Sequence, residues 1–198
     1  MKGHLPTPAQ LPLQMPQLRD GWQRRTCRAV LRLAGWSLVG AFPDAPKLVL
    51  IAAPHSSWWD GVWGLLVKVA IGADVNFMGK QELFFWPLGG LLRRLGGMPI
   101  DRSTAKGVVE QMIDQFRQRE KLWLGIAPEG TRKPVQRWKS GFWRIAHDAG
   151  VPIFPVAFHY HDKTIRLGPL FDTSADMDAD LVRLRAFYAP FKGKHRDV

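Results

Sequence analysis

The sequence predicts a single α/β domain with a mostly parallel β-sheet flanked by helices and an amphipathic helix at its N-terminus. Three observations support this prediction. The chain has 198 residues, the length of one ordinary domain with a sizeable core. Short apolar runs alternate with helical patterns, which is typical of βα repeats and a parallel sheet. We find no internal repeat and no shift in composition that would mark a second domain.

The N-terminal region is predicted to have two parts. Residues 1–18 are expected to be an extended, flexible leader, because repeated proline excludes a helix. Residues 19–41 are expected to form a basic amphipathic helix. Such a helix can lie in a membrane interface, and the alternative is a helix docked on the protein with a solvated arginine face. The helix combines basic and apolar positions: Arg19, Arg24, Arg25, Arg28 and Arg32, with Trp22, Ala29, Leu33 and Trp36 on another side.

The remaining elements follow from local patterns. Short β-prone runs predict strands at 47–53, 75–78, 98–101, 121–127, 153–160 and 164–167. Amphipathic runs predict helices at 60–71, 82–95 (interrupted), 103–118, 140–149 and 179–187. Asp60 is expected to cap the first of these helices, and Gly150 to end the fourth.

The amino-acid composition limits the kinds of partner and of site that the protein can have. Lys and Arg number 28 against 17 Asp and Glu, so the net charge of +11 predicts partners with negative groups: phosphates, nucleic acid or an anionic membrane. The single cysteine, Cys27, excludes a disulfide framework and a cysteine zinc site. Nine tryptophans suit either a membrane interface or a tryptophan-rich core. No uncharged apolar stretch reaches the ~18 residues of a membrane span.

Polar residues follow three of the predicted strands. They are His55 and Asp60 after residues 47–53, Asp101 and Arg102 after the third strand, and residues 128–132 (PEGTR) after the fourth. Ligands of open α/β sheets bind beyond the carboxyl ends of the strands. We therefore expect these side chains to converge on one rim of the sheet.

His55 and Asp60 are the sharpest pair. A histidine near its reference pKa of ~6.5 can accept a proton from a hydroxyl at neutral pH. A carboxylate five residues later could accept the other ring N–H, fix the tautomer and stabilise the imidazolium. The alternative is a solvated loop histidine next to an ordinary helix-capping aspartate.

The PEGTR segment has features of a phosphate site. Gly130 lets the backbone approach a ligand, and Arg132 offers a bidentate fork for phosphate. Basic residues continue from Arg132 to Arg144 without an acidic residue, which creates a local field that attracts anions. Lys80 and Arg102 are two further possible phosphate ligands. A plain turn is the alternative for this segment.

Four ordered blocks resemble the glycerolipid acyltransferase family, in its bacterial 1-acyl-sn-glycerol-3-phosphate acyltransferase type. They are the H-x4-D block at 55–60 (HSSWWD), the pair 79–83 (GKQEL) and 97–102 (GMPIDR), the block 128–132 (PEGTR), and 151–156 (VPIFPV). The resemblance covers about residues 45–170, within an acyltransferase domain expected over residues 19–198.

The resemblance implies roles for individual residues. His55 would be the general base and Asp60 the residue that orients it. Glu129 cannot bind phosphate itself and would hold Arg132 or a loop amide, whereas Pro152 would line the acyl side. The substrate-binding residues that the resemblance implies are Lys80, Arg102, Glu129, Gly130, Thr131, Arg132 and Pro152.

The resemblance also implies an activity: transfer of an acyl group from acyl-CoA or acyl carrier protein to the hydroxyl of a lysophospholipid. The first candidate acceptor is 1-acylglycerol-3-phosphate, which would give phosphatidic acid. No metal, no cofactor and no nucleic-acid partner are expected, and the enzyme would attach peripherally to the anionic cytoplasmic face of the inner membrane. The alternatives are another acceptor such as lyso-ornithine lipid, an esterase or thioesterase, and a non-catalytic binder of anionic lipid or nucleic acid.

Two other groupings have simpler explanations. Asp176, Asp178 and Asp180 have the spacing of a calcium loop but lack its glycine and glutamate, so helix capping is predicted instead. His159 and His161 share one face of a predicted strand, where a partly solvated polar pair is favoured over a metal site.

Overall fold

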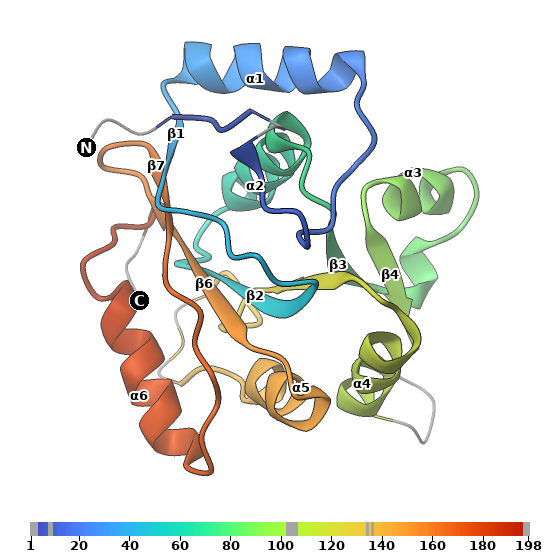
Figure 1. The fold of residues 1–198 in the computed structure, drawn as a ribbon, viewed down its shortest axis with the longest axis vertical. Helices are drawn as coiled ribbons and strands as arrows, with labels where there is room; N and C mark the ends of the chain where they lie inside the picture. Colours follow the sequence, from blue (N-terminus) through green and yellow to red (C-terminus); the bar gives the residue numbers. More distant parts are fainter. Residues whose placement is uncertain (1–3, 8–9, 102–106, 134, 136, 196–198) are drawn as a thin grey trace.

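The computed structural model describes residues 4–7, 10–101, 107–133, 135 and 137–195, with the backbone alone for Lys80 and Leu83. A seven-stranded sheet forms its centre, in the order β1-β7-β6-β2-β5-β3-β4 (Figure 1). The strands are β1 (Ser37–Val39), β2 (Lys47–Ala53), β3 (Val75–Lys80), β4 (Gly97–Ile100), β5 (Leu122–Ile126), β6 (Ile153–His159) and β7 (Thr164–Leu167). The helices are α1 (Trp22–Ala34), α2 (Trp58–Ile71), the short 3₁₀ turn η2 (Gln81–Leu83), α3 (Leu88–Arg94), α4 (Val108–Gln118), α5 (Gly141–Ala149) and α6 (Met177–Tyr188).

The sheet is mostly parallel, which confirms the predicted fold class. Strands β2 to β6 all run in one direction, as expected where a helix connects successive strands. A short turn joins β6 to β7, so β7 pairs antiparallel with β6. Strand β1 pairs parallel with β7 and therefore runs against the other five strands.

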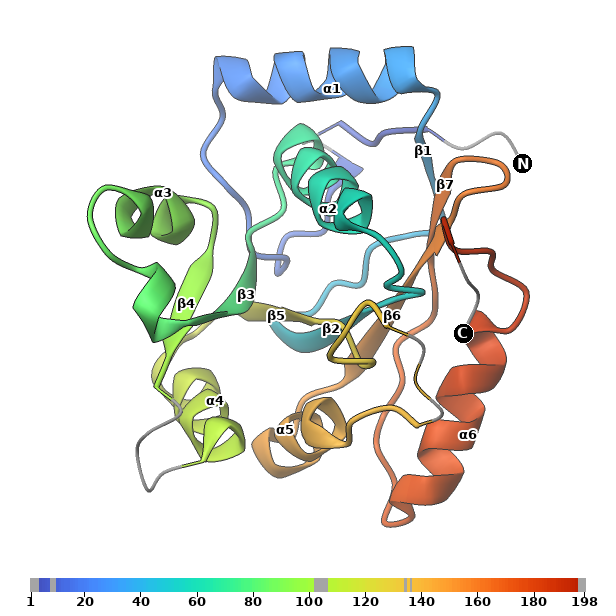
Figure 2. The same cartoon turned by 180° about the vertical axis from the view of Figure 1, so that it is seen from behind.

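Helices cover both faces of the sheet, and each side has its own apolar core. Figures 1 and 2 show α1, α2 and α3 on one side of the sheet and α4, α5 and α6 on the other. Buried side chains on the α2 side include Leu31, Trp36, Ile71, Trp123 and Phe154. Those on the α5 side include Met112, Phe116, Phe142, Ile145 and Tyr188.

The N-terminal helix is shorter than predicted. It ends at Ala34, because Gly35 adopts the left-handed conformation (φ 79°) that closes a helix C-terminus. The predicted helical residues 37–39 instead form β1, whose partner, β7, is more than 100 residues away in the chain. Trp36 is consequently buried and does not lie on an exposed helix face.

Two arginines of α1 also point inward. The Arg24 guanidinium donates to the Leu18 carbonyl at 3.2 Å, and the side chain is buried. Arg28 donates to the carbonyls of Leu5 and Pro6, at 2.7 and 2.6 Å. The outward side of α1 carries Trp22, Arg25, Arg32 and Leu33.

The described part of the leader is extended, as predicted, but it is anchored rather than loose. Met15 and Leu11 are buried in the core on the α2 side. Single β-bridges join His4 to Leu38 and Gln17 to Ala73. The described part of the leader therefore packs on the domain and supplies backbone carbonyls that Arg24 and Arg28 bind.

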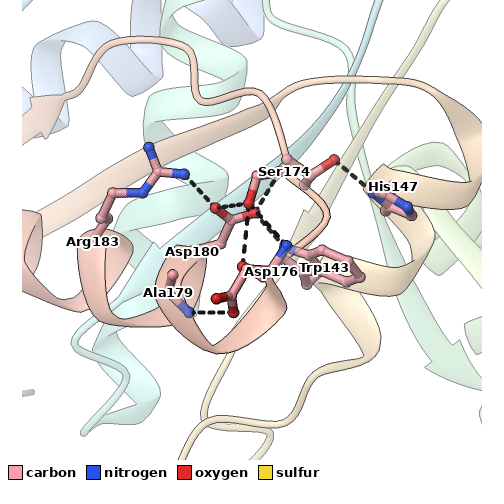
Figure 3. Close-up of polar contacts among 8 residues, drawn as sticks. Trp143, His147, Ser174, Asp176, Ala179, Asp180 and Arg183 are labelled. Carbon is pink, nitrogen blue, oxygen red and sulfur yellow. Dashed lines mark hydrogen bonds and ion pairs between the residues drawn. The ribbon is translucent and has the colours of Figure 1, made fainter.

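The acidic segment before α6 caps this helix, as the sequence predicts (Figure 3). The Asp176 carboxylate accepts the Ala179 N–H at 3.0 Å. Asp180 is fully buried and accepts from Trp143 Nε1 (2.9 Å), from the Ser174 N–H (2.7 Å) and from Arg183. Burial by itself would raise the pKa of Asp180, but these hydrogen bonds outweigh it and lower the pKa to about 2.

Replacing Asp180 by Asn should therefore destabilise the fold by about 1–3 kcal/mol, because a buried charge-assisted network loses its anion. The carboxyl pKa is lower in the folded state than in the unfolded state. Its contribution is thus complete above the unfolded pKa of ~3.9 and is lost as the pH falls toward about 2. Urea unfolding at neutral and acid pH measures both effects. Asp178→Asn, on the exposed side of the same helical turn, is the control, and an equal loss in both variants would contradict the role of the network.

Candidate active site

Three chain segments meet at the carboxyl edge of the parallel strands. Ile51 of β2 pairs with Ile126 of β5, and Ala53 pairs with Ala157 of β6. The loops that follow these strands therefore leave the sheet at the same level. Figure 2 shows the loop after β5 in front of the sheet, near the start of α2. The sequence predicted this convergence for the loops after β2 and β5.

His55 and Asp60 contact each other at this edge. Nδ1 of His55 lies 3.2 Å from Oδ2 of Asp60; the Asp60 side chain is buried, and 28% of the His55 side chain is exposed. Burial by itself would raise the pKa of Asp60, but hydrogen bonds from His55, Tyr160 and Ser57 lower it. An ionised Asp60 favours the tautomer with the proton on Nδ1, and in neutral imidazole the lone pair is then on Nε2.

The start of α2 holds Asp60 in place. Ser57 is the N-cap residue, not Asp60 as predicted, and its hydroxyl accepts the Trp59 N–H at 3.2 Å. Oδ2 of Asp60 accepts the backbone N–H groups of Ser56 and Ser57, each at 2.8 Å. Asp60 therefore completes a capping box and contacts His55 at the same time. The same carboxylate has both of the roles that the sequence offered as alternatives, helix capping and contact with His55.

Glu129 ties the loop after β5 to the loop after β2. Its side chain is buried, and Oε1 accepts the backbone N–H of His55 at 2.8 Å. This contact is the loop-amide role, one of the two expected for Glu129. The next residue, Gly130, has φ 65°, and a Cβ there would lie 2.7 Å from the Lys139 side chain. The positive φ favours glycine at this turn.

Basic and aromatic side chains surround the mouth of the site. The Arg132 guanidinium lies over the ring of Trp58, 3.8 Å from its centroid, in cation–π geometry. Lys194, from the C-terminal segment, lies 5.0 Å from the ring of Trp59. Thr131 accepts the Lys133 N–H through its hydroxyl at 3.2 Å. The mouth is thus positively charged and bordered by two exposed tryptophans.

A cavity of about 900 Å³ opens at this mouth. Its polar part includes His55, Asp60, Arg132 and Lys139, together with Gly130 and Thr131. Elsewhere its walls are largely apolar, and they include Leu50, Val67, Ile71, Phe77, Trp123, Phe158 and Ile165. A large apolar cavity with a histidine–carboxylate pair and cations at its mouth suits an amphiphilic ligand, with the anionic end outside and the hydrocarbon inside.

Three of the predicted site residues have no described side chain at this site. Lys80 is the last residue of β3, so its backbone lies at the same edge of the sheet. Arg102 lies outside the described residues. Pro152 precedes β6 at the opposite end of the strand from His55, and its carbonyl accepts the Val49 N–H, so it does not line the cavity.

Sequence reasoning missed Tyr160. Its hydroxyl donates to Oδ1 of Asp60 at 2.5 Å. Its position in the sequence could have indicated a role at the site, because Tyr160 ends a predicted strand at the edge where the other polar residues lie. The two histidines near it, His159 and His161, have rings 6.1 Å apart. In the described part of the chain, no three His, Cys, Asp or Glu side chains cluster as a metal site requires.

The chain resembles several known proteins. A 1-acyl-sn-glycerol-3-phosphate acyltransferase from Neisseria gonorrhoeae is 27% identical over 62% of this chain and 48% of its own length. The enzyme of that name from Escherichia coli is 34% identical over 47% of this chain and 40% of its own length. A lyso-ornithine lipid O-acyltransferase from Pseudomonas aeruginosa is 28% identical over 81% of this chain and 60% of its own length. The chain thus spans about half the length of these curated relatives.

A solved structure has the same fold. The 1-acyl-sn-glycerophosphate acyltransferase PlsC from Thermotoga maritima superposes with a TM-score of 0.59, over 86% of this chain and 80% of its own, at 17% identity. The sequence profile of the Acyltransferase family matches residues 41–159, a span that includes β2 to β6 and the histidine–aspartate pair. With more than half of its length matched in this way, the chain belongs to the acyltransferase family.

Proposed function

We propose that the protein transfers an acyl group from a thioester, acyl-CoA or acyl carrier protein, to the hydroxyl of a lysophospholipid. The observation that carries the proposal is the 3.2 Å contact between Nδ1 of His55 and the buried Asp60 at the mouth of a large apolar cavity. The names of the relatives support 1-acylglycerol-3-phosphate as the first acceptor to test.

The proposed mechanism is direct transfer. Nε2 of His55 removes the proton from the acceptor hydroxyl as its oxygen attacks the thioester carbonyl. The new C–O bond forms, the C–S bond breaks, and the leaving thiolate takes the proton from the imidazolium. Asp60 fixes the ring and stabilises the imidazolium while it exists. No covalent acyl-enzyme is required in this sequence.

The positive mouth is proposed to bind the anionic end of the acceptor. Arg132 is the side chain best suited to a phosphate, because it combines a bidentate donor fork with a fixed position over Trp58. Glu129 contributes indirectly, since it holds the backbone of His55. Lyso-ornithine lipid is the second candidate acceptor, and the relative of that name matches the larger share of this chain.

Replacing His55 by Ala should lower kcat/KM by ~10²–10⁴-fold, because the transfer loses its general base. Mass spectrometry of products from a panel of lysolipids, with both donors, measures this. His161→Ala, at an exposed histidine in the β6–β7 turn, is the matched control. A folded His55→Ala protein that kept most of its activity would rule out the proposed mechanism.

Replacing Arg132 by Ala should raise the KM for a phosphate-bearing acceptor by about 10–100-fold and change the donor KM much less. This corresponds to one charge-assisted phosphate contact of roughly 1.5–3 kcal/mol. Lys133→Ala, at the exposed neighbouring residue, is the control. Steady-state kinetics with lysophosphatidate and with lyso-ornithine lipid separates the two acceptors. An equal effect on the acceptor that lacks phosphate would show that Arg132 does not bind that group.

The distribution of exposed apolar side chains supports a membrane-facing surface. We define the helical face as the exposed apolar side chains of α1, α2 and the segment around α3. Its members are Trp22, Val30, Leu33, Trp58, Trp59, Val62, Phe85, Trp86, Leu88 and Leu91. Among the described residues, the three helices on the opposite side of the sheet carry one large exposed apolar side chain, Val182. Exposed apolar side chains concentrated on one side of a protein are typical of an interaction surface.

We propose that the helical face rests on an anionic membrane. Arg25 and Arg32 on α1 and Arg93 and Arg94 on α3 are exposed beside the apolar side chains, where they can meet lipid phosphates. Arg24 and Arg28 do not contribute, because both are bound to backbone carbonyls of the leader. No helix among the described residues is long and apolar enough to span a membrane.

Substitution of Trp22 and Trp86 by Ser should weaken binding to anionic liposomes, because tryptophan contributes strongly at the interface. Co-sedimentation at low and high salt measures binding, which should also weaken as salt screens the arginines. Val182→Ser, on α6, is the control. Binding that ignores lipid charge, salt and both tryptophans would show that another surface makes the attachment.

A further inference from the structure

The pairing of β6 with β2 brings Tyr160 to the catalytic pair. Ala53 of β2 pairs with Ala157 of β6, and both strands run in the same direction. Two residues beyond Ala53 lies His55, and three residues beyond Ala157 lies Tyr160. A residue 100 positions away from Asp60 in the sequence therefore faces it across the edge of the sheet.

The two oxygens of Asp60 have different partners. Oδ2 lies 3.2 Å from Nδ1 of His55 and accepts the N–H groups of Ser56 and Ser57. Oδ1 accepts the hydroxyl of Tyr160 at 2.5 Å. Without Tyr160, one oxygen of a buried carboxylate would lose a hydrogen-bond donor, and the carboxylate could rotate away from the imidazole.

We propose that Tyr160 is a positioning residue for acyl transfer: its hydroxyl holds Oδ1 of Asp60 so that Oδ2 keeps the His55 ring oriented. The inference rests on the proposed role of His55 as the general base. Tyr160 acts through Asp60 and does not itself need to touch the substrate.

The phenol ring of Tyr160 is itself fixed. The ring of Trp36 meets it edge-on, with centroids 5.1 Å apart and an interplanar angle of 89°. Trp36 also packs on Trp63 of α2 at 5.2 Å, and the Tyr160 N–H donates to the Lys192 carbonyl at 2.8 Å. Trp36 directly follows Gly35, the C-cap of α1. The N-terminal helix is therefore connected to the catalytic pair by the contact between Trp36 and Tyr160 and the hydrogen bond from Tyr160 to Asp60.

The electrostatics agree with this geometry. Burial, followed by the hydrogen bond to Asp60 and the charge of Asp60, raises the pKa of Tyr160 well above its usual value. The phenol therefore stays protonated and donates, and the same bond lowers the pKa of Asp60. The carboxylate remains an anion facing His55, which is the state that stabilises an imidazolium.

Tyr160→Phe tests the inference with the loss of a single oxygen atom. We expect kcat to fall about tenfold, with the KM of donor and acceptor unchanged, because the lost bond supports the transition state and not substrate binding. The second readout is the proton NMR resonance of His55 Nδ1–H, which lies far downfield when it is bound to a carboxylate. It should shift or broaden in Tyr160→Phe while circular dichroism stays that of the wild type.

Tyr188→Phe is the matched control, because the chain contains only these two tyrosines. The Tyr188 hydroxyl is also buried and bonded, donating to the Ile51 carbonyl at 2.7 Å, but it lies in the core on the α5 side. Its loss should lower thermal stability and leave both kcat and the resonance unchanged.

The experiment distinguishes failure of the positioning role from failure of the proposed function. Wild-type kcat and an unmoved resonance in Tyr160→Phe would overturn the positioning role, and so would equal changes in the two tyrosine variants. If the wild-type protein transfers no acyl group to any acceptor, the proposed function fails. The resonance of wild type against Tyr160→Phe still decides whether Tyr160 holds the His55–Asp60 pair.

Discussion

The carboxylate of Asp60 is the interaction on which the rest of the site depends. A buried anion is tolerated only when donors surround it, and this one has two backbone N–H groups, an imidazole and a phenol. These donors come from the loop after β2, from the start of α2 and from the end of β6. One carboxylate therefore caps α2, orients His55 and binds the residue that follows β6.

The active-site loops are joined below the surface, and the ligand space lies beside them. The Glu129 carboxylate holds the backbone of His55, so the loops after β2 and β5 form one unit. Beside that unit, the cavity has cations at its mouth and apolar walls inside. This polarity matches the amphiphilic substrates named for the relatives. The polar and the apolar parts of this lining are therefore separate regions of one cavity.

The N-terminal segment contacts residues of the site and also carries exposed apolar side chains. Arg24 and Arg28 bind leader carbonyls, and Arg28 also donates to the Ala70 carbonyl of α2 at 3.3 Å. Trp36, just beyond α1, contacts the ring of Tyr160. The same helix carries Trp22 and Leu33 on its exposed side. The structure thus shows the docked helix, one of the two alternatives at the level of sequence, whereas a helix lying in the membrane interface stays a prediction.

Local sequence patterns predicted most of the regular elements and the candidate catalytic pair. The strands at 47–53 and 164–167 match their predicted bounds, and the fold class is confirmed. The H-x4-D spacing, together with the resemblance of four ordered blocks to a known family, pointed to the pair that the structure brings into contact. Three features became visible only in the folded protein: strand β1, the inward-pointing Arg24 and Arg28, and the hydrogen bond from Tyr160 to Asp60. Each depends on groups far apart in the chain, such as β1 on β7, and no periodicity within a short window reports on such a partner. Local propensity selects helix or strand, but burial and hydrogen-bond satisfaction across the whole fold decide what each side chain meets.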